Sequence, residues 1–548
     1  MQFLTFIGFT ALVAIIAYYK TRNEEATSDG YFLGGRSLTA GVIAGSLLLT
    51  NLSTEQIVGL NGSAYQSGLS VMVWETLAAV AMIVTAIFLL PRYLKGGLTT
   101  VPGFLAKRFD IRTKTLTSVL FLSGYVVVLL PVILYSGSLA ISGMFDVPQL
   151  LGVSHTQSIW ICVWGIGIIG SIYAVFGGLK AVAVSDSINA IGLLIGGLLI
   201  PIFGLMLIGE NGSIIDGLSV LVTENPDKFK SMGGTTDPVP FYTIFTGMML
   251  VQVFYWGTNQ QIIQRALGAK NLKEGQKGLL LASFIKILGP IIVVLPGLIA
   301  FHLFQGNLES ADSAYPMLVK KVLPGAWVGF FAAVLFGAIL SSFNSVLNSS
   351  VTLFGIDVYK QHINKAADEK TVVKYGKIFG VTLAIAAMFI APLIANAGSL
   401  FDYLQEINGI YSIPILTIIV VGYLTKRVPA IAAKVGLVSG CVLYIISQFF
   451  LKDYFIGSAL EEASIAGIVD TAQLALIEAQ AYPHFLDVMA ILFVLNISIM
   501  LIIGKLYPRE EAFVHEYTKQ VDITPWKYTK LVGGIICVIV IGLYMYFA

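Results

Sequence analysis

Fourteen apolar segments of membrane-spanning length run through the chain, and they limit its fold more than any other feature. A helix needs about 20 mostly apolar residues to cross the hydrocarbon core of a bilayer. The segments cover residues 3–19, 38–62, 68–91, 115–144, 156–176, 181–208, 239–264, 278–304, 323–354, 375–397, 400–424, 428–451, 484–504 and 531–547. We therefore predict an all-α integral membrane protein with 14 transmembrane helices, embedded in a lipid bilayer as a single membrane domain over residues 1–548.

The composition agrees with this class and excludes several others. Charged residues make up 12% of the chain, whereas a soluble domain has about a quarter, so they are too few to cover several globular surfaces. The 33 basic residues are nearly balanced by 31 acidic residues and form no basic run, which excludes a nucleic-acid partner. The three cysteines lie in apolar stretches, where small buried side chains are expected rather than a disulfide scaffold.

Lysine and arginine are distributed unevenly between the predicted loops. If the N-terminus lies outside, the inside loops hold 27 of the 33 basic residues, the outside loops hold 5, and Lys286 lies within a helix. Because short basic loops stay on the cytoplasmic side, we expect both termini outside. A count of thirteen helices would invert the later loops and remove this asymmetry. The segment 3–19 resembles a signal peptide, but it lacks a basic leader and a small-residue cleavage site, so we expect a retained helix.

Two predicted helices are interrupted by polar residues. The second contains the stretch from Leu49 to Gln56, and the seventh contains the stretch from Tyr255 to Gln261. Such stretches are typical of unwound helices whose freed backbone groups line a cavity; the alternative is that they are helix ends near the headgroups. Since the breaks are five helices apart, we predict two inverted five-helix repeats, each opening with a discontinuous helix. The repeats cover 38–208 and 239–424, with an extra helix at 3–19 before them and three C-terminal helices in 428–548.

Hydroxyl side chains share one face of the ninth segment, where Ser341 and Ser342 follow Gly337. Small-residue helix packing would explain this face without a ligand. A hard cation prefers oxygen ligands, and an unwound stretch from Leu49 to Leu52 facing the two serines would supply carbonyls and hydroxyls together. Taken alone, this face therefore favours helix packing, and together with the unwound stretch it could form a sodium site between the second and ninth helices.

Lys286 lies inside an apolar helix and needs a partner there. A lysine at membrane depth costs about 2.5–3.5 kcal/mol on insertion scales, and Glu75 in the third segment is the candidate partner. The pair could be purely structural, or it could contact a polar ligand. The role of Asp186 is also open, because it could simply be an acid at a helix end.

Six motifs in a fixed order make the chain resemble a known family. They are Asn51–Gln56 (NLSTEQ), Tyr173–Ala181 (YAVFGGLKA), Tyr255–Gln260 (YWGTNQ), Ile263–Arg265 (IQR), Leu295–Gly297 (LPG) and Ser341–Ser342. Over nearly its full length the chain is similar to the sodium/solute symporter family and to its bacterial sodium/galactose transporter branch. The resemblance implies a LeuT-like five-plus-five inverted-repeat core, alternating access, sodium coupling and a bacterial inner membrane.

The resemblance also implies functional residues, position by position. The sodium ligands would be the backbone carbonyls of Leu49, Leu52 and Ala338 and the hydroxyls of Ser341 and Ser342. The sugar would be bound by Gln56, Glu75, Gln252, Lys286 and Gln405, with Tyr255 at the inner gate and Leu60, Trp74 and Phe401 at the outer gate. The second sodium of some relatives would use Asp186, Asn344 and Ser345. One sodium is expected here, because Asn344 breaks the hydroxyl pattern.

Two departures from the branch leave the identity of the sugar open. Gln252 stands where the branch has an asparagine, and Ala78 stands where it has a serine. We therefore expect a sodium-coupled secondary transporter that imports a sugar, a hexose or a sugar derivative, with Na⁺ as the coupling ion and no enzymatic activity. The main alternative is a symporter of the same fold for a carboxylate or another small organic solute, which needs a free cation or a helix N-terminus at the substrate. An enzyme is disfavoured because the five histidines form no metal motif, and a sugar sensor because no signalling domain is attached.

Overall fold

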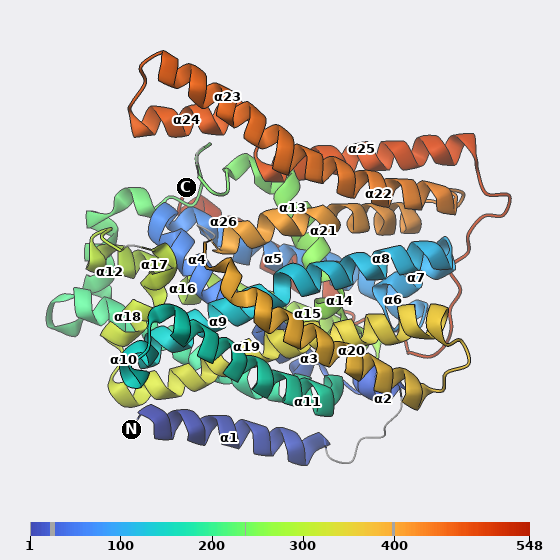
Figure 1. Ribbon diagram of the computed structural model, residues 1–548, viewed down its shortest axis with the longest axis horizontal. Coiled ribbons are helices and arrows are strands. Elements are labelled where there is room, and N and C mark those ends of the chain that lie inside the picture. The colour runs from blue at the N-terminus through green and yellow to red at the C-terminus, as the bar shows by residue number, and fades with distance from the viewer. Residues whose placement is uncertain (1, 22–27, 236, 309, 397–399) are drawn as a thin grey trace.

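The computed structural model describes residues 2–21, 28–235, 237–308, 310–396 and 400–548. These residues form a bundle of helices (Figure 1), and the β-type pairing among them is an isolated bridge between Leu38 and Ala269. Within the described residues, helices make up most of each of the fourteen predicted segments. Ten helical stretches of the described chain are long and apolar enough to cross a membrane, or eleven with one bent pair. An all-helical membrane protein is therefore confirmed, and the count of 14 stays a prediction.

The helices of the N-terminal part are α1 (Gln2–Thr21), α2 (Ser28–Leu33), α3 (Ala40–Asn51), α4 (Thr54–Ser67), α5 (Val73–Val84), α6 (Leu90–Lys95), α7 (Val101–Arg108), α8 (Ile111–Gly124), α9 (Leu130–Phe145), α10 (Val147–Leu151), α11 (His155–Ile208) and α12 (Ile214–Glu224). The long helix α11 contains two apolar stretches of spanning length, His155–Ile172 and Val182–Ile208. They correspond to two separate predicted spans.

The remaining helices are α13 (Gly247–Gly257), α14 (Gln260–Leu267), α15 (Leu272–Lys286), α16 (Gly289–Val293), α17 (Leu295–Phe304), α18 (Ala314–Val322), α19 (Gly325–Thr352), α20 (Glu369–Ile390), α21 (Leu400–Leu424), α22 (Ala430–Ile446), α23 (Lys452–Ile465), α24 (Thr471–Ala481), α25 (Phe485–Leu506) and α26 (Thr529–Tyr546). The predicted span 278–304 is bent by 50° between α15 and the following pair α16 and α17.

Short segments of other helix types join these elements. Four π-helical segments continue a neighbouring α-helix: η3 (Thr85–Leu89), η4 (Tyr125–Leu129), η9 (Leu353–Ile363) and η11 (Ser447–Leu451). The 3₁₀ turns are η1 (Gly34–Arg36), η2 (Gly68–Met72), η5 (Glu210–Gly212), η6 (Pro226–Phe229), η7 (Phe241–Phe245), η8 (Ala311–Ser313) and η10 (Ala391–Asn396).

The interior of the bundle is built around α3, which packs against α11, α15 and α19. The additional helix α1 lies along one edge of the molecule, where it contacts α11 and α19 (Figure 1). The hairpin of α23 and α24 lies at the opposite edge, beyond α22 and α25. The elements that carry the predicted site residues therefore lie inside the bundle, between these two edges.

Both predicted helix breaks are present. Between α3 and α4, Leu52 and Ser53 leave the helical conformation, with ψ angles of 54° and 177°. Between α13 and α14, the capping residue is Asn259, whose side chain accepts a hydrogen bond from the amide of Gln261 at 3.2 Å and so caps α14. The hydroxyl of Tyr125 donates to the same Asn259 oxygen at 2.7 Å and fixes its orientation.

The first break is narrower than the sequence pattern suggests. The predicted unwound stretch runs from Leu49 to Gln56, but α3 stays helical to Asn51 and α4 begins at Thr54. Some polar side chains of the stretch bond to other helices while their own backbone stays helical. Thr50, for example, stays in the helix while its hydroxyl lies 3.2 Å from that of Ser345 on α19.

Close packing of α3 against α11 depends on Gly45. A Cβ atom at this position would lie 2.8 Å from the Cα atom of Ser187, whereas a Cβ atom at Gly41, one turn earlier, would meet nothing within 4 Å. Gly45→Ala is therefore expected to destabilise the fold by about 1–3 kcal/mol through overpacking. Gly41→Ala is the matched control and should leave the melting temperature of the detergent-solubilised protein unchanged. Equal melting temperatures for both variants would contradict this packing.

Candidate substrate and sodium sites

A cavity lies beside the two helix breaks and is lined mainly by polar and aromatic side chains. Most of its lining comes from α3, α4, α5, α13 and α21 and includes Asn51, Glu55, Gln56, Trp74, Gln252, Tyr255, Trp256, Gln405 and Asn408. Three of the five predicted sugar-binding residues, Gln56, Gln252 and Gln405, are among them. The amides supply both donors and acceptors, and the rings supply flat apolar faces.

The two charged members of the predicted set form an ion pair behind this lining. The Nζ atom of Lys286 lies 2.5 Å from Oε2 of Glu75, and the two side chains are 1% and 0% exposed. The amide of Gln56 donates to the other carboxylate oxygen, Oε1, at 2.7 Å. Both oxygens of Glu75 are therefore bonded, and Gln56 connects the ion pair to the cavity. The pairing predicted for Lys286 is present.

The bend after α15 makes room for this ion pair. A Cβ atom at Gly289 would lie 2.2 Å from Oε2 of Glu75, so a larger residue would displace the carboxylate. The ammonium group of Lys286 also lies 5.8 Å from the ring centroid of Trp256, within the range of a cation–π interaction. Gly289 at the bend and the ring of Trp256 thus both lie next to the buried charges.

Gln252 is held by two hydrogen bonds to tryptophan residues. Its Nε2 atom donates to the backbone carbonyl of Trp74 at 3.1 Å, and its Oε1 atom accepts from the indole of Trp256 at 3.2 Å. Gln252 therefore lies next to the backbone of the helix that carries Glu75. A substrate that binds Gln252 has to compete with these internal bonds.

The predicted gate residues differ in their positions. Tyr255 and Trp74 line the cavity. Leu60 is fully buried in α4 and is not part of the lining. The side chain of Phe401 lies outside the described residues. The structure therefore brings two of the four gate residues to the cavity.

The cavity also contains an acid at membrane depth to which the sequence motifs assign no role. Glu55 lies on the first turn of α4, is 8% exposed and lines the cavity. Its Oε2 atom has no hydrogen-bond partner among the described residues. The sequence could have pointed to Glu55, because it directly precedes the predicted sugar-binding residue Gln56 in the motif Asn51–Gln56.

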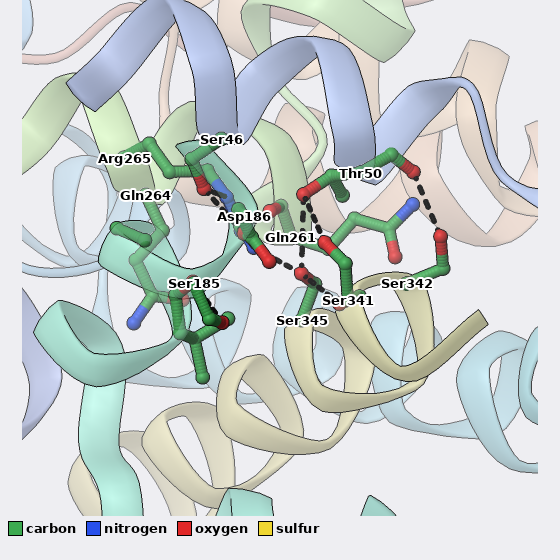
Figure 2. A network of polar contacts seen from close by, with 12 residues as sticks. Ser46, Thr50, Ser185, Asp186, Gln261, Gln264, Arg265, Ser341, Ser342 and Ser345 are labelled. Carbon is green, nitrogen blue, oxygen red and sulfur yellow. Dashed lines mark hydrogen bonds and ion pairs between the residues drawn. The ribbon is translucent and has the colours of Figure 1, made fainter. Parts of the chain in front are cut away.

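The predicted sodium ligands lie where α3 faces α19 (Figure 2). The hydroxyl of Ser342 donates to the backbone carbonyl of Thr50 at 3.1 Å, and the hydroxyls of Thr50 and Ser341 are 3.5 Å apart. Leu49, Leu52 and Ala338 are buried beside them, at 0%, 2% and 0% exposure. Because α3 ends here, carbonyls of its last turn lack the amides of a following turn. Hydroxyls and carbonyl oxygens thus meet at one place, which is a donor set suited to a hard cation.

Arg265 is a buried cation, although the sequence pattern places it in an inside loop. It is fully buried on α14, and its Nε atom donates to the hydroxyl of Ser46 at 3.0 Å. Its guanidinium group also contacts the hydroxyl of Ser345 and lies 3.9 Å from Oδ2 of Asp186. Ser46 donates to the same Asp186 oxygen at 2.6 Å (Figure 2). Two of the three candidate ligands for a second sodium therefore already contact a positive charge.

The third candidate ligand, Asn344, differs from the other two. It is fully buried, and neither its amide oxygen nor its amide nitrogen has a hydrogen-bond partner among the described residues. The structure thus brings Asp186 and Ser345 together through Arg265, while Asn344 remains outside this network.

Comparisons with known proteins assign the family. The sequence model of the sodium:solute symporter family matches residues 31–440. The chain belongs to this family. The symporter is 47% identical to the uncharacterised symporter YidK of Escherichia coli over 546 residues, which cover 99% of this chain and 90% of that protein. It is 31% identical to the sodium/glucose cotransporter of Vibrio parahaemolyticus over 473 residues, covering 82% and 85% of the two chains.

Solved structures show the fold. A Na⁺-coupled sialic acid symporter in a substrate-bound outward-open state superposes with a TM-score of 0.72 at 18% identity, covering 93% of this chain and 99% of that chain. The nucleobase-cation symporter Mhp1 gives a TM-score of 0.52 at 15% identity, covering 89% and 96% of the two chains. The symporter thus has the fold of these transporters. Its family further shows that it uses sodium, crosses the membrane several times and is a transporter rather than an enzyme.

The ion pair of Glu75 and Lys286 gives a prediction that does not depend on the substrate. Removing one partner strands the other charge, which costs about 3–5 kcal/mol. Glu75→Ala and Lys286→Ala should therefore each destabilise the protein strongly, and the double variant should be less destabilised than the sum of both. A double-mutant cycle of unfolding in detergent measures this coupling, with Gln252→Ala as a neutral control. Additive effects would show that the two charges do not depend on each other.

Proposed function

We propose that the symporter imports a neutral sugar, a hexose or a sugar derivative, together with sodium by alternating access. The observation that carries the proposal is the cavity itself, in which amides and aromatic rings adjoin a charge-compensated pair of Glu75 and Lys286. Sugar hydroxyl groups need donors and acceptors together, and the amides of Gln56, Gln252 and Gln405 provide both.

The charges at the cavity favour a neutral substrate over a carboxylate. Lys286 is already compensated by Glu75 at 2.5 Å. The described lining residues include Glu55 but neither lysine nor arginine. An anionic substrate would therefore meet an acid without a free cation, whereas a neutral polyol leaves the existing pair intact. The alternative, a carboxylate symporter, requires Lys286 to exchange Glu75 for the substrate.

The names of two relatives agree with a neutral polyol. One is the sodium/glucose cotransporter described above, and another is the human sodium/myo-inositol cotransporter 2, which is 28% identical over 466 residues. In this proposal Tyr255 closes the inner side of the site, and Leu60, Trp74 and Phe401 close its outer side. Access alternates through two inverted repeats, 38–208 and 239–424, in a bacterial inner membrane with both termini outside.

Coupling follows from the position of the first helix break. We assign the sodium ligands to the carbonyls of Leu49, Leu52 and Ala338 and to the hydroxyls of Ser341 and Ser342. A sodium ion there would connect the end of α3 to α19. Gln56 lies on the first turn after the same break and donates to Glu75 at 2.7 Å. Sodium would thus fix the orientation of α4 and, with it, the amide that reaches the sugar site.

Transport by proteoliposomes tests the proposed substrate. With an inward sodium gradient, hexoses or close derivatives should compete for uptake, and sialate, proline and acetate should not. Gln252→Ala should raise the half-saturating sugar concentration about fivefold, because a net hydrogen bond contributes about 0.5–1.5 kcal/mol. Replacing sodium by choline is the control and should abolish uptake. Sodium-driven uptake of a carboxylate that survives Lys286→Ala, without competition by any sugar, would refute the assignment.

The position of Arg265 predicts the stoichiometry. Because its guanidinium group contacts Ser345 and lies 3.9 Å from Asp186, a second sodium would have to displace a resident cation. One sodium ion per sugar is therefore expected from reversal-potential measurements in proteoliposomes. A ratio of two would show that Asp186, Asn344 and Ser345 bind an ion in spite of Arg265.

A further inference from the structure

A second pocket, rich in basic residues, lies where α6 and α21 end and shares no lining residue with the substrate cavity. Its lining includes Arg92, Lys95, Lys426, His515, Tyr423 and Phe513. We call this group the basic pocket. Phe513 and His515 come from the segment that follows α25. This segment is attached to both helix ends, because the amide of Phe513 donates to the carbonyl of Lys426 at 2.9 Å and that of Thr518 donates to the carbonyl of Lys95 at 3.0 Å.

The basic residues of the pocket lack close acidic partners among the described residues. Arg92, Lys95 and Lys426 form no ion pair with a carboxylate of the described residues. The nearby Lys107 donates to the backbone carbonyl of Gly96 at 2.8 Å instead. Several cations thus converge on one hollow with no described acid paired to them, which favours an anionic ligand.

His515 adds a group that responds to such a ligand. Its Nε2 atom lies 2.8 Å from the backbone carbonyl of Arg92, which places the ring against α6. Burial and the neighbouring charges of Lys95, Lys107 and Arg92 lower the pKa of His515. These effects disfavour the charged form of the ring, and an anion in the pocket would oppose them.

Tyr423 forms an aromatic wall of the basic pocket. Its ring stacks on Phe104 with a centroid distance of 3.8 Å and an interplanar angle of 8°, so the wall it forms is rigid. Its hydroxyl group is shielded from solvent and has no hydrogen-bond partner among the described residues. Because the hydroxyl is shielded from solvent, it does not reach into the open pocket, and Tyr423 contributes its ring to the lining.

Exposed apolar side chains lie close in sequence to residues that line the basic pocket. Phe88 and Leu424 are 54% and 76% exposed, and they are close in sequence to Arg92 and Tyr423. The backbone carbonyl of Phe88 accepts a hydrogen bond from Arg92 at 2.6 Å. Cations beside exposed apolar side chains at the ends of spanning helices are typical of the interface between headgroups and acyl chains.

We propose that the basic pocket binds the phosphate headgroup of an anionic phospholipid, whose acyl chains lie along Phe88 and Leu424. Arg92, Lys95 and Lys426 compensate the phosphate charge. Free phosphate shares the headgroup chemistry, but it would leave the apolar side chains uncovered. The site is separate from the sodium and substrate sites, so the proposal does not depend on the identity of the transported solute.

Native mass spectrometry of the full-length protein tests this proposal. The protein released from nanodiscs of phosphatidylglycerol and phosphatidylcholine should retain an anionic lipid, and Lys95→Gln/Lys426→Gln should retain it at least tenfold less. Lys365→Gln/Lys374→Gln removes the same charge from exposed positions elsewhere and should retain the lipid like the wild type.

Two outcomes would overturn the proposal. Equal loss of lipid in both double variants would show a diffuse attraction of anionic lipids to basic residues. Retention of inorganic phosphate from neutral nanodiscs, with no preference for the anionic lipid, would show that the occupant is a free anion.

Discussion

The interruption between α3 and α4 is the feature on which the rest of the site depends. Two residues, Leu52 and Ser53, leave the helical conformation. On one side of the break, the last turn of α3 presents carbonyl oxygens toward the hydroxyls of α19, where Ser342 already bonds to Thr50. On the other side, the first turn of α4 carries Glu55 and Gln56 to the cavity. In the proposed assignment, one backbone irregularity therefore serves the sodium site and the sugar site together.

Pairs of buried charges connect the helices in this part of the bundle. Glu75 pairs with Lys286, and Asp186 lies 3.9 Å from Arg265. A third pair joins Lys114 to Asp357 at 2.7 Å, and Ser118 donates to the same carboxylate at 2.9 Å. Each pair connects helices that are distant in sequence. Since separating such a pair strands a buried charge, these contacts favour particular arrangements of the helices.

The sequence predicts the helical class, both breaks and the pair of Glu75 and Lys286, because each leaves a local signal. A lysine in the middle of an apolar helix requires a partner, and a polar stretch within a span indicates an interruption. Arg265 and Lys114 fall in predicted inside loops because they lie near the ends of spans. Their burial depends on how α14 and α8 pack against distant helices, and no local pattern records that packing.

In the proposed coupling, sodium at the break between α3 and α4 prepares the sugar site. Calorimetric measurement of sugar affinity in sodium and in choline tests this coupling directly, since coupling between two sites appears in the affinity for either ligand. We expect sodium to tighten sugar binding at least about fivefold in the wild type, a coupling of about 1 kcal/mol, and much less in Ser342→Ala. Equal sugar affinity with and without sodium would contradict the coupling.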